Sequence, residues 1–380
     1  MSVRKKIVES TTLEAEPIET VWWIADYTDG SGRRHQRRFK HKREALAFHD
    51  QMKVAIRAGT HVSVPSDLTI VDAADKWLKR VEADARERGT LKFYREHVKL
   101  HILPRIGKLK LAKLTKGHIE HFRDGLVSGE QKLSRPTAAK VLRSLKSMLK
   151  VVGCRHLGDG VNIEISKRGK PKLEVGRHIP TPHEVARLVQ AAKGKVRVLL
   201  MTAASTGLRA SELRGLRWHD VDLKAGELHV RQRADAWNTI GSPKSDGSRR
   251  TVPLGRELLL ALKEWKLACP KGEADLVFPT STGAVQHHKN MLESIEPVMK
   301  AAGVVNKDGS PKYALHAFRH FFASWCINPK DRGGRELPAK VVQSLLGHSS
   351  IMMTLDTYGH LFKDGSDRAE LDAAEKALFG

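Results

Sequence analysis

The sequence is poor in cysteine, and it contains no long apolar run. Its three cysteines, Cys154, Cys269 and Cys326, are odd in number and widely spaced. This argues against a disulfide framework or a cysteine metal site, and it favours buried free thiols in a reducing compartment. No segment approaches the roughly 20 apolar residues of a membrane span, and the N-terminal stretch MSVRKKIVES lacks the apolar core of a secretion signal. We therefore expect a cytoplasmic protein that does not bind a membrane.

Acidic residues are too few to balance the basic ones. The 380 residues include 67 Lys and Arg against 43 Asp and Glu, so the net charge is +24. A surplus of this size indicates a polyanionic partner, and nucleic acid fits because basic side chains displace its condensed counterions. An anionic membrane is the rival, but no amphipathic helix with a bulky exposed apolar face stands out. The hydrophobic content of 40% indicates folded cores, and the length predicts two or three domains.

The N-terminal part predicts a tail over residues 1–20 and a small DNA-binding domain over 21–63. The segment VWWIADYTDGSGRRHQRRF has a turn signal between two strand-like runs, and a helical pattern follows it up to Gly59. Seven Lys and Arg and no acid lie between Arg33 and Arg43. A solvated strand face is the alternative, but such a face normally mixes charges, so we favour a nucleic-acid-reading sheet. Its candidate DNA contacts are Arg33, Arg34, Arg37, Arg38 and Lys40.

Residues 64–165 predict a helical domain. Its second helix is expected to end at Pro104, and its fourth, PTAAKVLRSLKSMLKVV, has an apolar stripe and a separate basic stripe. An apolar face packed on other helices with a basic face outward fits a domain lying on a phosphate backbone. A plain solvated lysine face is nearly as good an explanation for this helix alone. The basic stripe consists of Lys140, Arg143, Lys146 and Lys150.

Residues 166–178 are basic, poor in apolar side chains and broken by Gly and Pro, so they predict a linker. The domain over 179–380 opens with a capping box, Thr181-Pro-His-Glu184, and continues with helices to about residue 216. Short strands around a Gly/Ser/Pro-rich turn follow, and further helices complete this domain. The last helix has an apolar seam, Leu371, Ala374 and Leu378. It could pack on a neighbouring subunit or on its own domain.

Three short segments of this domain carry the candidate chemistry. In STGLRASELRGLRW, Arg209 and Glu212 are three residues apart and share a helix face, although a surface ion pair alone would explain them. In LHAFRHFF, bulky apolar neighbours surround Arg319, and a desolvated arginine needs an anion.

His316 and His320 in that second segment have the spacing of a zinc helix. The glutamate of the metalloprotease motif is absent, and no third ligand is obvious. We therefore predict no metal and no other cofactor.

The third segment, LLGHSSIMMTLDTYGH, places His348 ten residues before Tyr358.

These residue types suit phosphoryl transfer without a metal. Two guanidinium groups can hold a phosphodiester whose oxygens gain charge in the transition state. A tyrosine, with a pKa of about 10, needs a cationic site and a proton acceptor to attack at neutral pH. The departing 5′ oxygen needs a proton, which Lys244 on a hairpin tip could donate. No GxxxxGK[ST] loop for ATP is found.

The segments TGLRASEL, HAFRHFFAS and LLGHSSIMMTLDTYGH resemble, in order, the three boxes of the tyrosine recombinase (phage integrase) family. The resemblance implies a multidomain, mainly α fold: an N-terminal three-stranded sheet plus helix that binds arm-type DNA, a helical core-binding (SAM-like) domain, and an α+β catalytic domain. It implies a catalytic set of Arg209, Lys244, His316, Arg319, His348 and Tyr358, with Glu212 supporting the first arginine. The loop INPKDRGGRELP, longer than the family's usual connection, is expected to contact DNA or a neighbouring subunit.

The implied function is site-specific recombination through a 3′-phosphotyrosine, which integrates or excises a mobile element without metal or ATP. The implied partners are double-stranded DNA with core-type and arm-type sites, three further copies of the chain in a tetramer, and accessory DNA-bending or excision factors. A related topoisomerase or resolvase activity and a DNA-binding regulator on the same scaffold are the alternatives.

Overall fold

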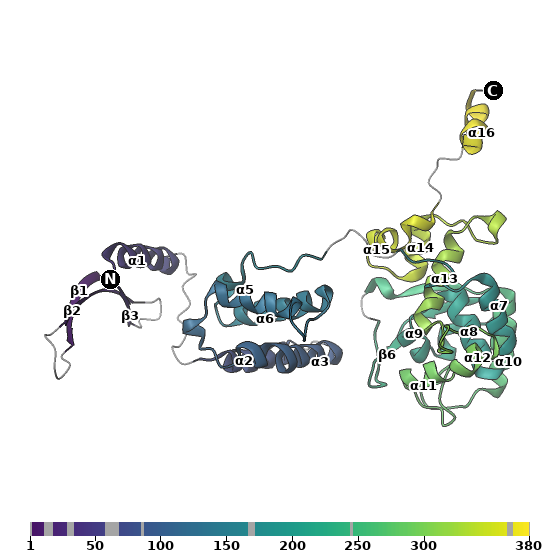
Figure 1. Cartoon of the computed structure of the whole chain (residues 1–380). Helices are drawn as coiled ribbons and strands as arrows, with labels where there is room; N and C mark the ends of the chain where they lie inside the picture. Colours follow the sequence, from purple (N-terminus) through teal and green to yellow (C-terminus); the bar gives the residue numbers. More distant parts are fainter. Residues whose placement is uncertain are drawn as a thin grey trace. The chain divides into compact units, whose positions relative to one another are not determined.

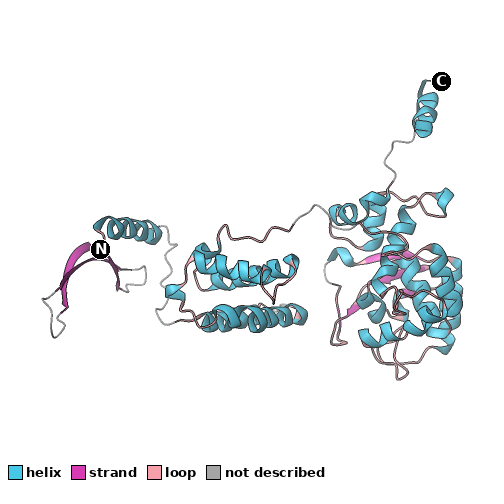
Figure 2. Cartoon of the chain, in the orientation of Figure 1, coloured by secondary structure: helices cyan, strands magenta, loops and turns pink. Residues whose placement is uncertain are grey.

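The computed structural model describes residues 2–10, 18–28, 34–57, 68–84, 87–165, 172–243, 246–362 and 368–379. The chain separates into two compact units, residues 1–169 and 170–380 (Figure 1). Helices dominate both, and strands occur in the N-terminal part and within the second unit (Figure 2). Among the described residues, no helix is both long and apolar enough to cross a membrane.

The first unit begins with a three-stranded antiparallel sheet in the order β1-β2-β3. Its strands are β1 (Ser2–Ser10), β2 (Ile18–Thr28) and β3 (Arg34–Phe39), and α1 (Lys42–Arg57) packs against β2. Ile24 and Ala25 of β2 and Ala45 of α1 are buried. The expected sheet plus helix is confirmed.

The prediction of a tail over residues 1–20 is wrong for Ser2–Ser10, which form β1. The strand is held by backbone pairing to β2, with Val3 opposite Ala25. Of residues 2–7 only Val3 is partly buried, so the alternation that marks a half-buried strand is missing from this segment. Pairing with the next strand, β2, which the pattern within this segment does not encode, makes it a strand.

The helical part of the first unit surrounds a single apolar core. Trp77, Ile102, Phe122, Leu145 and Met148 are at most 2% exposed there. The elements are α2 (Ile70–Ala83), α3 (Arg88–Glu96), the π-helical η1 (His97–Ile102), α4 (Leu103–Ile106), the 3₁₀ turn η2 (Leu111–Lys113), α5 (Lys116–Val127), α6 (Arg135–Val151) and the 3₁₀ turn η3 (Arg155–Gly158).

Pro104 does not end the second helix as the sequence predicts. The helical run continues from α3 through the π-helical turn η1 to Ile106. A proline has no N–H and its ring collides with the carbonyl four residues earlier. A π-helical turn widens the backbone at this point, and the Leu103 N–H donates to the Val98 carbonyl five residues back. The helix thus accommodates the proline.

The second unit contains two small sheets in addition to its helices. One sheet has the strand order β4-β5-β8 and the other pairs β6 with β7, all antiparallel. The strands are β4 (Val221–Asp222), β5 (Glu227–Val230), β6 (Arg233–Ala234), β7 (Ile240–Gly241) and β8 (Arg250–Pro253).

The helices of this unit supply most of its core. They are α7 (Pro182–Ala191), α8 (Gly194–Thr206), α9 (Ala210–Gly215), α10 (Arg256–Ala268), α11 (His288–Glu293), α12 (Glu296–Ala301), α13 (Leu315–Ile327), α14 (Ala339–Leu346), α15 (Ile351–Tyr358) and α16 (Arg368–Phe379). Four 3₁₀ turns connect them: η4 (Trp218–Asp220), η5 (Asp246–Ser248), η6 (Lys330–Arg332) and η7 (Gly359–Leu361). In the core, α13 packs against α8 and α14, and α14 packs against α15 and β8. These contacts bring the three sequence boxes together.

The last helix, α16, exposes Leu378 and Phe379 by 74% and 81%. The side chains of Leu371 and Ala374, which complete the predicted seam, lie outside the described ones. The seam therefore stays a prediction.

Candidate active site

The site begins at the turn between α8 and α9, where Arg209 is the residue before the helix. Gly207 ends α8 with a φ of 62°, and a Cβ there would lie 2.4 Å from Cδ1 of Phe322. Only glycine fits this close approach in the left-handed region. Arg209 then leads into α9, where its backbone N–H donates to Oε2 of Glu212 at 2.9 Å. The tight turn therefore fixes where the Arg209 side chain starts.

Glu212 binds two arginines from different elements. Its Oε1 accepts from Nη1 of Arg209 at 2.7 Å, and its Oε2 accepts from Nη2 of Arg250 at 2.8 Å. Burial opposes ionisation of this carboxylate, whose side chain is 3% exposed. The charges of Arg250 and Arg209 outweigh burial and lower the pKa of Glu212 to about 2. The carboxylate is therefore charged, and it holds both guanidinium groups.

Arg319, on α13, is held between the first and third boxes. Its Nη1 donates to the Gly207 carbonyl and its Nη2 to the Leu346 carbonyl, each at 2.6 Å. The residue is 2% exposed. Burial, together with the charges of Arg209 and Arg250, lowers the pKa of Arg319 to about 9. The positive charge of Arg319 is therefore not fully balanced by negative charge around it.

Gly347 and His348 follow α14 and lie close to Arg209 and Arg319. The Gly347 carbonyl accepts from Nη2 of Arg209 at 3.2 Å. Nδ1 of His348 lies 2.9 Å from the hydroxyl of Thr354, and the His348 ring is parallel to the Tyr358 ring at 6.5 Å. Burial and the charge of Arg319 lower the pKa of His348 to about 4. His348 is therefore neutral near pH 7.

Tyr358, the last residue of α15, is 2% exposed and packs in an apolar cluster with Phe322 and Leu346. Its hydroxyl lies 2.7 Å from Nδ1 of His320. Burial raises the pKa of Tyr358 to about 12, although the charges of Arg319 and Arg209 act in the opposite direction. The tyrosine is thus a neutral phenol within the electrostatic reach of both arginines.

His316 is one turn before His320 on α13 and is exposed. The two rings meet edge to face with centroids 4.7 Å apart. Partial desolvation and the charges of Arg319 and Arg209 lower the pKa of His316. In the described part of the chain, no three potential metal ligands come together around these or other residues.

The structure thus brings Arg209, Glu212, His316, Arg319, His348 and Tyr358 into one region. Lys244 and Arg33 lie outside the described residues. Two neighbours lie outside the set of residues that the sequence predicts: Arg250, which binds Glu212, and His320, which the sequence indicates only as half of a zinc pair. The i, i+4 spacing of His316 and His320 was the one available signal for His320.

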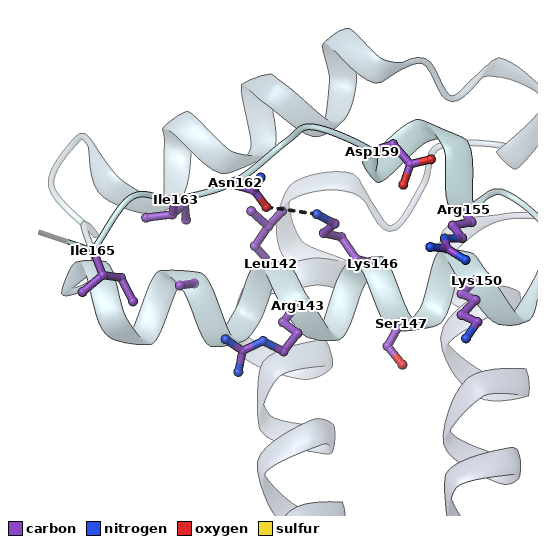
Figure 3. Close-up of a pocket in the computed structure, with 11 residues that line it drawn as sticks. Leu142, Arg143, Lys146, Ser147, Lys150, Arg155, Asp159, Asn162, Ile163 and Ile165 are labelled. Carbon is purple, nitrogen blue, oxygen red and sulfur yellow. Dashed lines mark hydrogen bonds between the residues drawn. The ribbon is translucent and has the colours of Figure 1, made fainter. Parts of the chain in front are cut away.

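The basic stripe on α6 is only partly free. Lys140, Arg143 and Lys150 are exposed, and a cavity of about 530 Å³ lies beside Arg143 and Lys150 (Figure 3). Lys146 instead points toward the following segment, where its Nζ donates to the Val161 carbonyl at 3.0 Å and to the Asn162 side chain at 3.2 Å. Lys146 therefore has a structural role in tying this segment to α6.

The basic strand β3 also has an internal partner. Nε of Arg34 donates to Oδ1 of the buried Asp26 at 2.9 Å. This hydrogen bond lowers the pKa of Asp26 to about 2. Arg37 lies over the rings of Phe39 and Phe48, and Arg38 and Lys40 are exposed.

Comparison with known proteins gives two family matches. The phage integrase family model matches residues 180–364, and the model of the phage integrase N-terminal SAM-like domain matches residues 69–127. A XerC-like tyrosine recombinase of Caldanaerobacter subterraneus subsp. tengcongensis is 26% identical over 357 residues, which cover 85% of this chain and 86% of that protein.

Solved structures share the fold. The Tn1549 transposon integrase, in complex with transposon right end DNA, has a TM-score of 0.62 at 21% identity and covers 80% of this chain and 99% of its own. A lambda integrase tetramer bound to a Holliday junction has a TM-score of 0.54 at 18% identity, with 87% and 93% covered. A SAM-like helical domain followed by this α+β domain defines an integrase-type architecture. The chain belongs to the phage integrase family of tyrosine recombinases.

Proposed function

We propose that the protein is a site-specific recombinase that cuts and rejoins DNA strands through a 3′-phosphotyrosine on Tyr358, and so integrates or excises a mobile element. The observation that carries this proposal is the charge balance of the site. Three guanidinium groups, of Arg209, Arg250 and Arg319, lie around one carboxylate, Glu212. The region lacks negative charge, and a phosphodiester supplies it.

In this proposal Arg209 and Arg319 hold the scissile phosphate. Arg209 is 32% exposed at its side chain, so it retains donors that face solvent. Arg319 is fixed by two backbone carbonyls, which sets its direction before the substrate binds. His316 and His348 donate to the phosphate or move protons, and Lys244 protonates the leaving 5′ oxygen.

The Tyr358 oxygen forms a bond to phosphorus while the bond from phosphorus to the 5′ oxygen breaks. The tyrosine proton passes to an acceptor, and the 5′ oxygen takes a proton from the general acid. The phosphotyrosyl ester resembles the bond it replaces, so a 5′-hydroxyl of a partner strand reverses the step without ATP or a metal ion. Because four strands are exchanged, we propose a homotetramer on DNA, the assembly that lambda integrase forms on a Holliday junction.

The domain assignments extend this proposal. Residues 2–63 would bind arm-type DNA through Arg37, Arg38 and Lys40. Residues 64–165 would bind the core site through Lys140, Arg143 and Lys150, followed by a linker over 166–178 and the catalytic domain over 179–380. Accessory DNA-bending or excision factors would assist, and the protein would act in the cytoplasm. The net charge of +24 supports polyanion binding by the whole chain.

A suicide substrate tests the proposal. The core-site DNA has the sequence found at the ends of the element that carries the gene, and it is nicked near the crossover. The full-length protein is incubated with this DNA in the presence of EDTA. We expect a covalent protein–DNA adduct, which Tyr358→Phe abolishes while gel-shift binding remains. An adduct that requires magnesium, or that persists in Tyr358→Phe, would contradict the proposal.

A further inference from the structure

The hydroxyl of Tyr358 has one hydrogen-bond partner among the described residues, Nδ1 of His320 at 2.7 Å. His320 comes directly after Arg319 and one helical turn after His316 on α13. One turn of α-helix rises about 5.4 Å, so this contact places the hydroxyl close to the residues that would hold a phosphate.

Two other polar side chains nearby, His348 and Arg319, have hydrogen-bond partners of their own. Nδ1 of His348 pairs with the hydroxyl of Thr354 at 2.9 Å. Both terminal nitrogens of Arg319 donate to backbone carbonyls. Apart from the hydroxyl, Tyr358 packs among apolar side chains such as Phe322 and Val342. His320 is therefore the group that directs the hydroxyl out of this apolar cluster.

The protonation states suit an acceptor. Burial, with the charges of His316 and Arg319, lowers the pKa of His320 to about 4, and burial raises the pKa of Tyr358 to about 12. Near pH 7 the pair is a neutral imidazole and a neutral phenol. With the imidazole proton on Nε2, Nδ1 accepts the hydroxyl proton in a hydrogen bond.

We propose that His320 is the positioning residue of the nucleophile: its Nδ1 accepts a hydrogen bond from Tyr358 and holds the hydroxyl beside His316 and Arg319. This inference rests on the proposed function. It concerns the direction of the hydroxyl and assigns no proton transfer to His320. A buried hydroxyl that loses its partner turns toward another one or leaves the cluster, and a misplaced nucleophile reacts more slowly.

Two substitutions separate positioning from proton acceptance and from packing. In His320→Asn, the amide oxygen occupies the place of Nδ1, so the variant keeps the acceptor but cannot serve as a base at neutral pH. In His320→Phe, the ring volume stays and the acceptor is lost. His219→Phe, at an exposed position of η4, is the matched control for replacing a histidine by phenylalanine.

The measurement is the single-turnover rate of adduct formation on the nicked core-site DNA at saturating protein, with binding followed by gel shift. We expect His320→Asn and His219→Phe to stay within about threefold of the wild-type rate. We expect His320→Phe to be about tenfold slower or more, since one hydrogen bond is at stake, with unchanged binding. Thermal unfolding of each variant reports whether the fold is kept.

Rescue by asparagine is the outcome that a merely structural histidine would not produce. If His320→Phe reacts at the wild-type rate or faster, His320 does not position the hydroxyl. If His320→Asn is as slow as His320→Phe, the acceptor geometry is not what matters. The proposed function fails in a different way, because the wild-type protein would then form no adduct.

Discussion

Replacing Glu212 by glutamine tests whether this buried carboxylate holds Arg209 and Arg250 in place. The side chain is 3% exposed and binds Arg209 and Arg250, of which Arg250 is only 5% exposed. Glutamine keeps the shape but removes the charge, and it leaves Arg250 buried without its counter-charge.

The magnitude follows from the pKa of Glu212, which is lowered from 4.5 to about 2. A difference of this size corresponds to roughly 3 kcal/mol of folding stability at pH 7, at about 1.4 kcal/mol for each pKa unit. Because the pKa is lower in the folded state, this stability is present above pH 4.5 and is lost as the pH falls toward 2. Near pH 3, about half of it remains.

The assay is urea unfolding of the full chain, followed by tryptophan fluorescence, for the wild-type protein and Glu212→Gln at pH 7 and at lower pH. The transition of the unit over residues 170–380 should lose about 3 kcal/mol at pH 7, and the difference should shrink below pH 4.5. Glu227→Gln, a half-exposed position on β5, should change little. A loss under about 1 kcal/mol, or one that does not depend on pH, would refute the reasoning.

Two further substitutions probe the same cluster. Gly207→Ala should lower the melting temperature more than Gly194→Ala. Both residues have positive φ angles. A Cβ at position 207 would lie 2.4 Å from Phe322, whereas nothing lies within 4 Å of a Cβ at position 194. Equal losses of melting temperature in the two variants would show that the Phe322 contact is unimportant. Arg319→Lys should reduce adduct formation about a hundredfold with DNA binding retained, because one ammonium group cannot reach both carbonyls and a phosphate as a guanidinium can. Full activity of the lysine variant in the suicide assay would contradict this role.

Contacts between close neighbours in the sequence could be predicted, because helical spacing places them on one face. Arg209 and Glu212 are three apart and form the expected ion pair. The tertiary partners could not be predicted in this way. Arg250 reaches Glu212 from 38 residues away, and Arg319 donates to backbone carbonyls, which leave no trace in a side-chain pattern. The contact between His320 and Tyr358 also depends on how α13 and α15 are packed.

The same distinction applies to the fold. The apolar stripe of α6 predicts its buried face, and Val141, Leu145 and Met148 are fully buried. The pattern does not show that Lys146 bends back to the Val161 carbonyl, since that contact depends on the path of the chain after the helix. The strand β1 and the passage through Pro104 likewise depend on pairing and on local backbone adjustment.

The most direct test of the central claim is to identify the atom that carries the DNA. The covalent adduct formed by the wild-type protein in EDTA would be digested with a protease, and the peptide attached to the DNA would be sequenced by mass spectrometry. We predict a 3′-phosphate ester on the Tyr358 oxygen and a free 5′-hydroxyl on the other DNA end. A DNA end attached to any other residue, or a 5′-linked phosphate, would contradict the account.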